Sequence, residues 1–191
     1  MRRRHIAILG GAAALLFVAA FVASPWFAAA RLVHALKTGD EAALEQLVDF
    51  RSVRRSLSSQ ISARLVAEAG REARGEASPF AGLVALIAPS MVDQAVQALV
   101  TPSGLARLSR LAREVDESRS QRRRDGGRDR EPEPADPTFG YTGVNSFAAT
   151  YFVKGGGRMI WTMEREKLVF WRLKRIEITD AVYEELALRI D

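Results

Sequence analysis

The chain has no cysteine and only two histidines among 191 residues. The absence of cysteine excludes a disulfide framework, a thiolate zinc site, an iron–sulfur cluster and a cysteine nucleophile. His5 and His34 are too few for a three-histidine metal site. We therefore expect no metal and no cofactor.

A concentrated basic excess is missing as well. Lysine and arginine number 28 against 23 acidic residues, a net charge of +5, but Arg2, Arg3 and Arg4 supply three of these charges. The rest of the chain, with 25 basic and 23 acidic residues, is nearly balanced. Nucleic-acid-binding domains carry a clustered excess of positive charge. We expect no nucleic-acid partner.

A long uncharged run covers residues 6–30 and is broken only by Ser24 and Pro25. As a helix, residues 6–23 measure about 27 Å, close to the thickness of a bilayer's hydrocarbon core. The pattern predicts a transmembrane anchor over residues 6–25 that contacts the lipid bilayer. More arginines precede the anchor than follow it, so the positive-inside rule leaves residues 1–5 in the cytoplasm and exports the rest. We therefore expect an anchored protein with a single membrane span.

A cleaved signal peptide begins with the same basic and apolar pattern. Ala28 and Ala30 suit the −3 and −1 positions of a cleavage site, but they lie far beyond the centre of the apolar run. Cleavage after Ala23 would place Phe21 at −3, where a small residue is required. An uncleaved anchor is the favoured interpretation. A buried helix of a soluble protein is disfavoured because no charge interrupts the run.

Helical periodicity covers residues 26–115. We expect Pro25 to end or bend the anchor and a short helix to occupy residues 26–38. Further helix boundaries are predicted at Gly39, Asp40, Asp49, the segment 75–79, Ser90 and Thr101. Residues 80–88, FAGLVALIA, are too few to span a bilayer and form either a buried core helix or an interfacial segment.

A charged segment follows at residues 116–138. Up to residue 137 it holds six arginines, seven acidic residues, two glycines and three prolines, with no large apolar side chain. Such a composition cannot bury enough surface to offset the entropy of ordering, so we predict a disordered linker.

Alternating apolar residues predict strands within residues 139–191. We expect an antiparallel meander of three strands at 147–154, 159–164 and 168–178, a glycine turn at 155–157 and a helix from Asp180. The apolar parity changes in the third strand, which predicts a β-bulge near Lys174 and Arg175. The fold class is α+β, with the meander packed on a helix. An NTF2-like or cystatin-like roll is an analogy at the level of fold.

Three stretches carry a resemblance to a known family: SPWFAAARLVHALKTGDEAALEQLVDFRSVRRSLSSQI, the later TPSGLARL, and the strand WRLKRIEI. Together they resemble the bacterial domain-of-unknown-function family 2939 over roughly residues 24–179. The resemblance implies a membrane-anchored protein of the bacterial envelope, so the expected location is the bacterial inner membrane, with the domain in the periplasm. It transfers no activity and no site residues.

Two groups of residues are candidate contacts. Arg51, Arg54 and Arg55 put positive charge on one helical face, which suits anionic lipid headgroups or an acidic patch on a partner, or forms an ordinary solvated face. Trp161 and Trp171 lie in an aromatic-rich sheet, where they belong to the core or line a cavity for an apolar small molecule.

These patterns predict a non-catalytic binding or scaffold module for a lipid-like ligand or an envelope protein partner. No serine lies in a nucleophile elbow or an S-x-x-K pattern. The alternative is an enzyme that acts on an envelope substrate through carboxylate or serine chemistry, and a buried carboxylate of raised pKa would favour it. A third interpretation is an assembly partner whose exposed apolar face is the interface.

Overall fold

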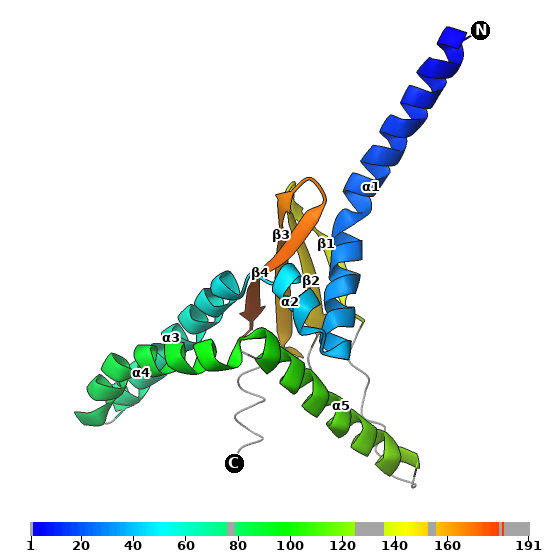
Figure 1. The fold of residues 1–191 in the computed structure, drawn as a ribbon. Coiled ribbons are helices and arrows are strands. Elements are labelled where there is room, and N and C mark those ends of the chain that lie inside the picture. The colour runs from blue at the N-terminus through cyan, green and yellow to red at the C-terminus, as the bar shows by residue number, and fades with distance from the viewer. Residues whose placement is uncertain (1, 76–78, 125–135, 153–155, 180, 182–191) are drawn as a thin grey trace.

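The computed structural model describes residues 2–75, 79–124, 136–152, 156–179 and 181 (Figure 1). The predicted α+β class is confirmed. The elements are α1 (Arg2–Thr38), α2 (Glu41–Leu47), α3 (Phe50–Gly75), α4 (Pro79–Leu99), α5 (Pro102–Arg124), β1 (Thr138–Gly143), β2 (Ser146–Phe152), β3 (Arg158–Lys167) and β4 (Phe170–Ile178).

The sheet is an antiparallel meander in the order β1-β2-β3-β4. It has one strand more than predicted. The additional strand, β1, has the sequence TFGYTG, in which two glycines and the adjoining charged segment obscure the alternation of apolar and polar residues. The predicted bulge is confirmed: Thr162 pairs with Arg175 and Met163 with Leu173, so Lys174 is the extra residue. The bulge explains the change of parity along β4.

Helix α1 continues without a break through Pro25, so the prediction of a separate helix over residues 26–38 is wrong. Proline lacks the N–H that would bond the carbonyl of Phe21, four residues earlier. The Ser24 hydroxyl donates to that carbonyl over 2.8 Å instead. A side chain thus replaces the missing backbone donor and lets the helix continue.

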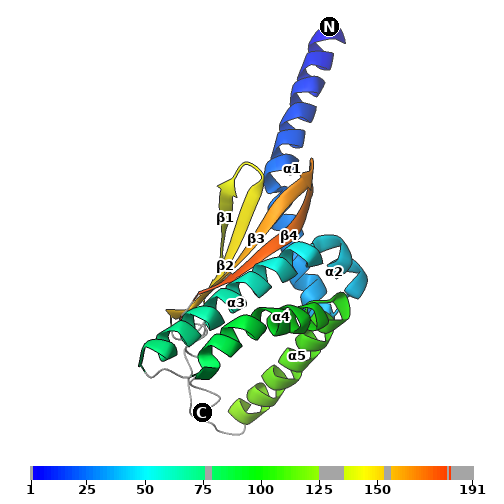
Figure 2. The ribbon, with the colours of Figure 1, turned by 90° about the vertical axis from the view of Figure 1, so that its left-hand side faces the viewer.

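The two halves of α1 have different surroundings. The first half projects away from the rest of the molecule (Figures 1 and 2), and Leu15, Leu16 and Phe17 are 73%, 71% and 56% exposed. The second half packs on the sheet and buries Leu32 and Ala35. Among the residues that the structure describes, α1 is the one helix long and apolar enough, by length and composition, to cross a membrane.

Local capping sets most of the other helix boundaries. Asp40 accepts from the Ala43 N–H over 3.0 Å, Asp49 from Ser52 over 3.1 Å, and Thr101 from Gly104 over 3.0 Å, as predicted. Gly39 has φ +70°, the left-handed conformation that glycine adopts at a helix end.

The predicted helix start at Ser90 is wrong. Helix α4 passes through Pro89, and the Ser90 hydroxyl bonds back to the carbonyl of Ile87 over 2.8 Å instead of capping a new helix. Residues 80–88 are part of α4, and Leu86 and Ile87 are exposed. The other side chains of this segment, apart from these two, lie outside the described residues.

The predicted linker begins too early, because α5 runs on to Arg124. Residues 116–124 are charged but contain neither glycine nor proline, and arginine, glutamate and glutamine are good helix formers. Residues 125–135, part of the predicted glycine turn and nearly all of the predicted C-terminal helix lie outside the described residues.

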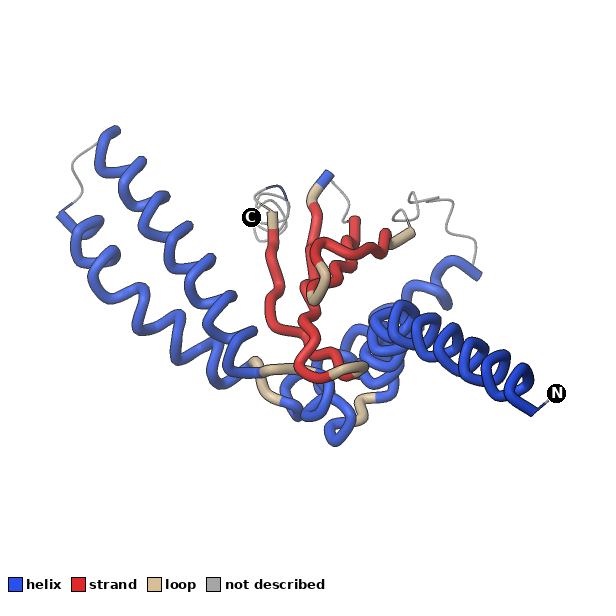
Figure 3. Tube along the Cα trace, turned by 90° about the horizontal axis from the view of Figure 1, so that it is seen from above, coloured by secondary structure: helices blue, strands red, loops and turns tan. Residues whose placement is uncertain are grey.

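The hydrophobic core lies between one face of the sheet and the helices α1 and α2. The sheet contributes Phe147, Met163, Trp171 and Leu173, all at most 2% exposed. The helical side of the core is made of Ala28, Ala29, Leu32, Ala35, Leu44, Leu47, Val48 and Val53. Helices α3 and α4 form an antiparallel pair that extends away from the sheet (Figure 3). The arrangement leaves α1 and the tips of the sheet together at one end.

Candidate functional site

A cleft of about 700 Å³ lies between α1, α2 and the hairpin of β3 and β4. We call it the α1–hairpin cleft. Its lining residues are Ala20, Ser24, Phe27, Ala28, Arg31, Glu45, Gln46, Leu47, Glu166, Lys167, Val169, Phe170, Trp171 and Arg172. Its volume falls within the range of small-molecule sites.

The α1 side of the cleft has an apolar end and a charged end, whereas the hairpin side also contributes the charged residues Glu166, Lys167 and Arg172. Along α1 its wall changes from Ala20 through Phe27 to Arg31, about 16 Å further down the helix axis. Helix α2 adds the polar side chains of Glu45 and Gln46, whereas Val169 lies at the hairpin turn. A site that is apolar toward one end and charged toward the other matches an amphiphile.

Three side-chain hydrogen bonds, of which the one between Trp171 and Ser24 is buried, hold the sheet against α1 near Pro25. The Trp171 Nε1–H donates to Ser24 Oγ over 2.8 Å, and Ser24 Oγ donates to the carbonyl of Phe21. The Tyr141 hydroxyl donates to the carbonyl of Val22 over 2.9 Å. The Phe21 carbonyl, which Pro25 leaves without a backbone donor, is thus bonded by the Ser24 side chain, and the adjacent Val22 carbonyl is bonded by Tyr141.

Arg165 adds a cation to this contact. Its guanidinium carbon lies 3.6 Å from the centre of the Phe21 ring and 4.4 Å from that of Trp171, within the range of cation–π attraction. Its Nη1 donates to the carbonyl of Leu168 over 2.7 Å, and its backbone N–H donates to the carbonyl of Asn145 over 2.9 Å. Arg165 therefore connects the β1–β2 turn and the β3–β4 turn to α1.

The rim of the cleft is rigidly held on the side of α2. Arg172 Nη2 donates to the carbonyls of Val48 over 2.7 Å and Glu45 over 3.2 Å. The Asp49 N–H donates to the carbonyl of Leu173 over 2.9 Å. These bonds join α2 and the start of α3 to the edge of β4.

A charged cluster adjoins this rim. The Lys174 ammonium lies 2.7 Å from a carboxylate oxygen of Asp49 and 2.7 Å from one of Glu166. Burial opposes ionisation of Asp49, but the hydrogen bonds from Lys174 and Ser52 outweigh it and lower the pKa of Asp49 to about 2. The Lys174 hydrogen bond also lowers the pKa of Glu166, and both carboxylates raise that of Lys174.

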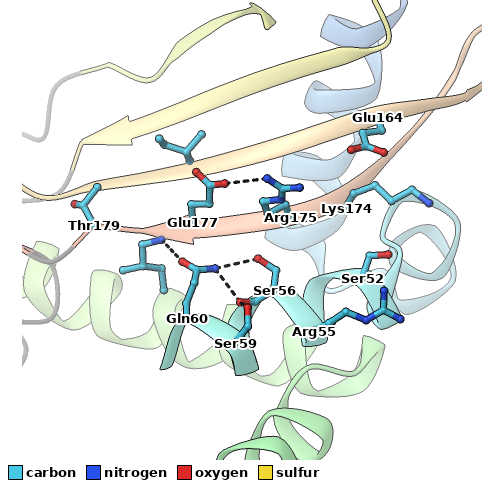
Figure 4. Close-up of a pocket in the computed structure, with 12 residues that line it drawn as sticks. Ser52, Arg55, Ser56, Ser59, Gln60, Glu164, Lys174, Arg175, Glu177 and Thr179 are labelled. Carbon is cyan, nitrogen blue, oxygen red and sulfur yellow. Dashed lines mark hydrogen bonds and ion pairs between the residues drawn. The ribbon is translucent and has the colours of Figure 1, made fainter. Parts of the chain in front are cut away.

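A second, polar cleft lies between α3 and the edge of β4 (Figure 4). Gln60 spans it: Nε2 donates to the Ile176 carbonyl over 2.7 Å, and Oε1 accepts from the Ile178 N–H over 3.1 Å. Ser56 Oγ donates to the same Ile176 carbonyl over 3.2 Å, and Ser59 Oγ donates to the carbonyl of Ser56. These side chains hydrogen-bond the backbone groups of the edge strand β4, so we assign them a structural role.

Neither cleft contains an evident catalytic array within the described part of the chain. No three histidine, aspartate or glutamate side chains there are grouped to hold a metal. Asp49 and Glu166, the described carboxyls with a shifted pKa, are lowered rather than raised. His34 lies apart from the serines, in an apolar groove with Trp26 and Phe139.

Residues 14–108 match the model of the family described as "Protein of unknown function (DUF2939)". The chain belongs to the DUF2939 family. No curated protein and no solved structure matches the chain. The family prediction is confirmed, although the match ends at residue 108 and not near 179.

The DUF2939 match includes α2, α3, α4 and most of α1, but none of the strands. The helical wall of the α1–hairpin cleft therefore belongs to the matched region, whereas the hairpin wall lies beyond it. The family description carries no activity, so the chemistry of the cleft has to be argued from its own residues.

The structure places the predicted arginines together. Arg51, Arg54 and Arg55 line a groove between α3 and α4 that also contains Asp93. Arg51 and Arg55 are exposed and Arg54 is half-buried. The groove lies apart from the α1–hairpin cleft, and a role in binding stays a prediction.

The predicted tryptophans lie on the same face of the sheet but in different surroundings. Trp171 is 2% exposed and lines the α1–hairpin cleft. Trp161 is half-buried, and its ring centre lies 4.9 Å from that of Tyr151, whose pKa is raised by burial. Only Trp171 is placed to meet a ligand in the cleft.

Sequence reasoning missed the residues that fasten the hairpin to α1: Ser24, Tyr141 and Arg165. Ser24 offered a signal, because it is a polar residue directly before a proline within an apolar run. Tyr141 lies in the strand that was not predicted, and Arg165 lies between the second and third predicted strands, where a turn was expected. Their role depends on contacts more than a hundred residues apart along the chain.

Proposed function

We propose that this DUF2939 protein is a non-catalytic binding module of the bacterial envelope that holds a lipid-like ligand in the α1–hairpin cleft. The proposal rests on one observation: the α1 wall of the cleft is apolar at Ala20 and charged at Arg31, about 16 Å further along the helix. An acyl chain fits the end at Ala20 and Val169. An anionic or polar headgroup fits the end at Arg31.

We also propose that the first half of α1 is a single membrane span, with the N-terminus cytoplasmic and the domain in the periplasm. Exposed apolar side chains around this half of the helix support it, since they make no core of their own. Arg2, Arg3 and Arg4 before the span favour this orientation. The apolar end of the cleft then opens at the membrane surface.

An uncleaved anchor is supported by the second half of α1. Cleavage after Ala30 would remove Ala28 and Ala29, which are 8% and 6% exposed in the hydrophobic core. It would also remove Ser24, the acceptor for the buried Trp171 N–H. The folded domain needs residues that a signal peptidase would take away.

The test is native mass spectrometry of the full chain released from membranes in mild detergent. We expect an added mass in the range of a lipid or fatty acid. Gln46→Trp, which fills the cleft from α2, should abolish that added mass. Gln97→Trp is the matched control, because Gln97 lines the separate groove between α3 and α4.

Arg31→Gln tests the charged end of the cleft. It should weaken retention of an anionic ligand, whereas Arg107→Gln, the same charge change at an exposed position on α5, should leave it unchanged. An added mass that survives Gln46→Trp would refute the cleft as the site. A stoichiometric protein in place of a small molecule would support the alternative of an envelope protein partner.

A further inference from the structure

Two turns of the sheet expose large apolar side chains. Val144 lies in the turn between β1 and β2 and is 82% exposed. Leu168 and Val169 form the turn between β3 and β4, and with the adjoining Phe170 they are 67%, 43% and 63% exposed. We call these four residues the hairpin tips. Turn positions ordinarily carry polar residues or glycine, so an apolar cluster here calls for a partner.

The hairpin tips lie at the end of the domain where α1 emerges. Both turns point toward the projecting half of α1 (Figures 1 and 2). The contacts of Tyr141 with Val22 and of Arg165 with Phe21 fix the tips beside this part of the helix. The hairpin tips therefore lie in or next to the same medium as the exposed apolar side chains that precede Phe21 on α1.

We infer that the hairpin tips insert into the interfacial layer of the bilayer that α1 spans. This inference rests on the proposed membrane anchor, but not on the proposed ligand of the cleft. The patch lies at the same end of the domain as the exposed apolar side chains of α1, which favours a lipid surface over a separate protein partner. It consists of two turns and not of an open strand edge, so it offers no ladder for pairing with a second copy.

The residues around the tips fit the headgroup layer. Trp26 is 43% and Tyr141 38% exposed, and their rings meet edge to face with centres 5.5 Å apart. Tryptophan and tyrosine are enriched at membrane interfaces. Lys167 is exposed beside the turn, where its ammonium can meet anionic phosphates. The domain would thus contact the membrane through its tips as well as through its anchor.

The chain has no cysteine, so single-cysteine labelling tests the inference directly. The full chain carrying Leu168→Cys, labelled with an environment-sensitive fluorophore, is reconstituted into vesicles of phosphatidylcholine and phosphatidylglycerol. A label on Leu108→Cys is the matched control, because Leu108 is an exposed leucine on α5 (51%) that lies away from the projecting half of α1. A label on Val18→Cys reports on the anchor itself.

We expect the label at 168 to emit at shorter wavelength than the label at 108 and to lose most of its fluorescence when the vesicles contain lipid with a shallow spin label. In a second variant, Leu168→Ser with Phe170→Ser, a label on Val144→Cys should lose much of this quenching. Far-UV circular dichroism of the same sample shows whether that variant is folded.

The outcomes separate this inference from the proposed anchor. Quenching at 18 by a deep spin label, with 168 behaving like 108, overturns the insertion of the tips and leaves the anchor standing. No quenching at 18 overturns both. A blue shift at 168 that needs no lipid and grows with protein concentration shows an interface between copies of the chain, and it also overturns the inference.

Discussion

Replacement of Ser24 by alanine probes the side-chain hydrogen bonds near Pro25. The substitution removes the acceptor of the buried Trp171 N–H and the donor to the Phe21 carbonyl. Ser24 is 8% and Trp171 2% exposed, so water does not readily replace the lost partner. A buried polar group left without a hydrogen bond costs about 1–3 kcal/mol. We expect the free energy of unfolding to fall by about that amount.

The coupling between the two residues gives a sharper magnitude. Trp171→Phe removes the indole N–H, so in that background Ser24→Ala no longer strands a buried donor. The double-mutant cycle should therefore show a coupling of about 1–2 kcal/mol, within the range for residues in one network. Ser109→Ala is the matched control: its hydroxyl donates to the Leu105 carbonyl over 2.9 Å within α5, with no tryptophan involved. We expect Ser109→Ala to change stability by about 0.5 kcal/mol or less.

The assay is chemical unfolding of the full chain in detergent micelles, followed by far-UV circular dichroism. Four proteins complete the cycle: wild type, the two single variants and the double variant. If Ser24→Ala unfolds at the same denaturant concentration as the wild type, or if the coupling is zero, the hydrogen bonds of Ser24 do not stabilise the junction.

Three further predictions concern other contacts. Asp49→Asn keeps an N-cap but breaks the ion pair with Lys174, and should cost about 1 kcal/mol or less, whereas Asp49→Ala should cost about 1 kcal/mol more. Because the pKa of Asp49 is lowered to about 2, the advantage of wild type over Asp49→Asn is present above about pH 4 and should vanish as the pH falls toward 2, in unfolding measured across that range. Gln60→Ala should unpair the edge of β4, cost about 1–2 kcal/mol and speed hydrogen exchange at the Ile178 amide, whereas unchanged exchange would contradict the assigned role. Gly39→Ala forces a side chain into φ +70° and should cost about 1 kcal/mol by thermal unfolding, with Gly39→Asn closer to wild type.

Features set by neighbouring residues could be predicted from the sequence. The caps at Asp40, Asp49 and Thr101 depend on residues three positions ahead, and the bulge at Lys174 is visible as a change of apolar parity within one strand. The family, the α+β class and the start of the helical region also follow from local patterns.

Features set by distant residues could not be predicted. A proline usually ends a helix, but α1 continues past Pro25 with the Ser24 hydroxyl bonded to Trp171 and the Val22 carbonyl bonded to Tyr141, both from distant strands. Strand β1 has too few apolar residues to be predicted from its own sequence, and it forms because it pairs with β2. The α1–hairpin cleft needs all these elements in place, so only Trp171 among its residues was a candidate beforehand.

Helix α1 joins two environments, and Pro25 lies where they meet. Between residues 10 and 20 its side chains are exposed, and after Ser24 its Leu32 and Ala35 form part of the hydrophobic core. At the boundary, Ser24 bonds the Phe21 carbonyl that Pro25 leaves without a backbone donor, and Tyr141 from the sheet bonds the adjacent Val22 carbonyl. The junction is therefore a packed and hydrogen-bonded contact and not a flexible tether. With the first half of α1 in a bilayer, that contact fixes which side of the domain faces the membrane, and the side it selects carries both the open apolar end of the α1–hairpin cleft and the hairpin tips.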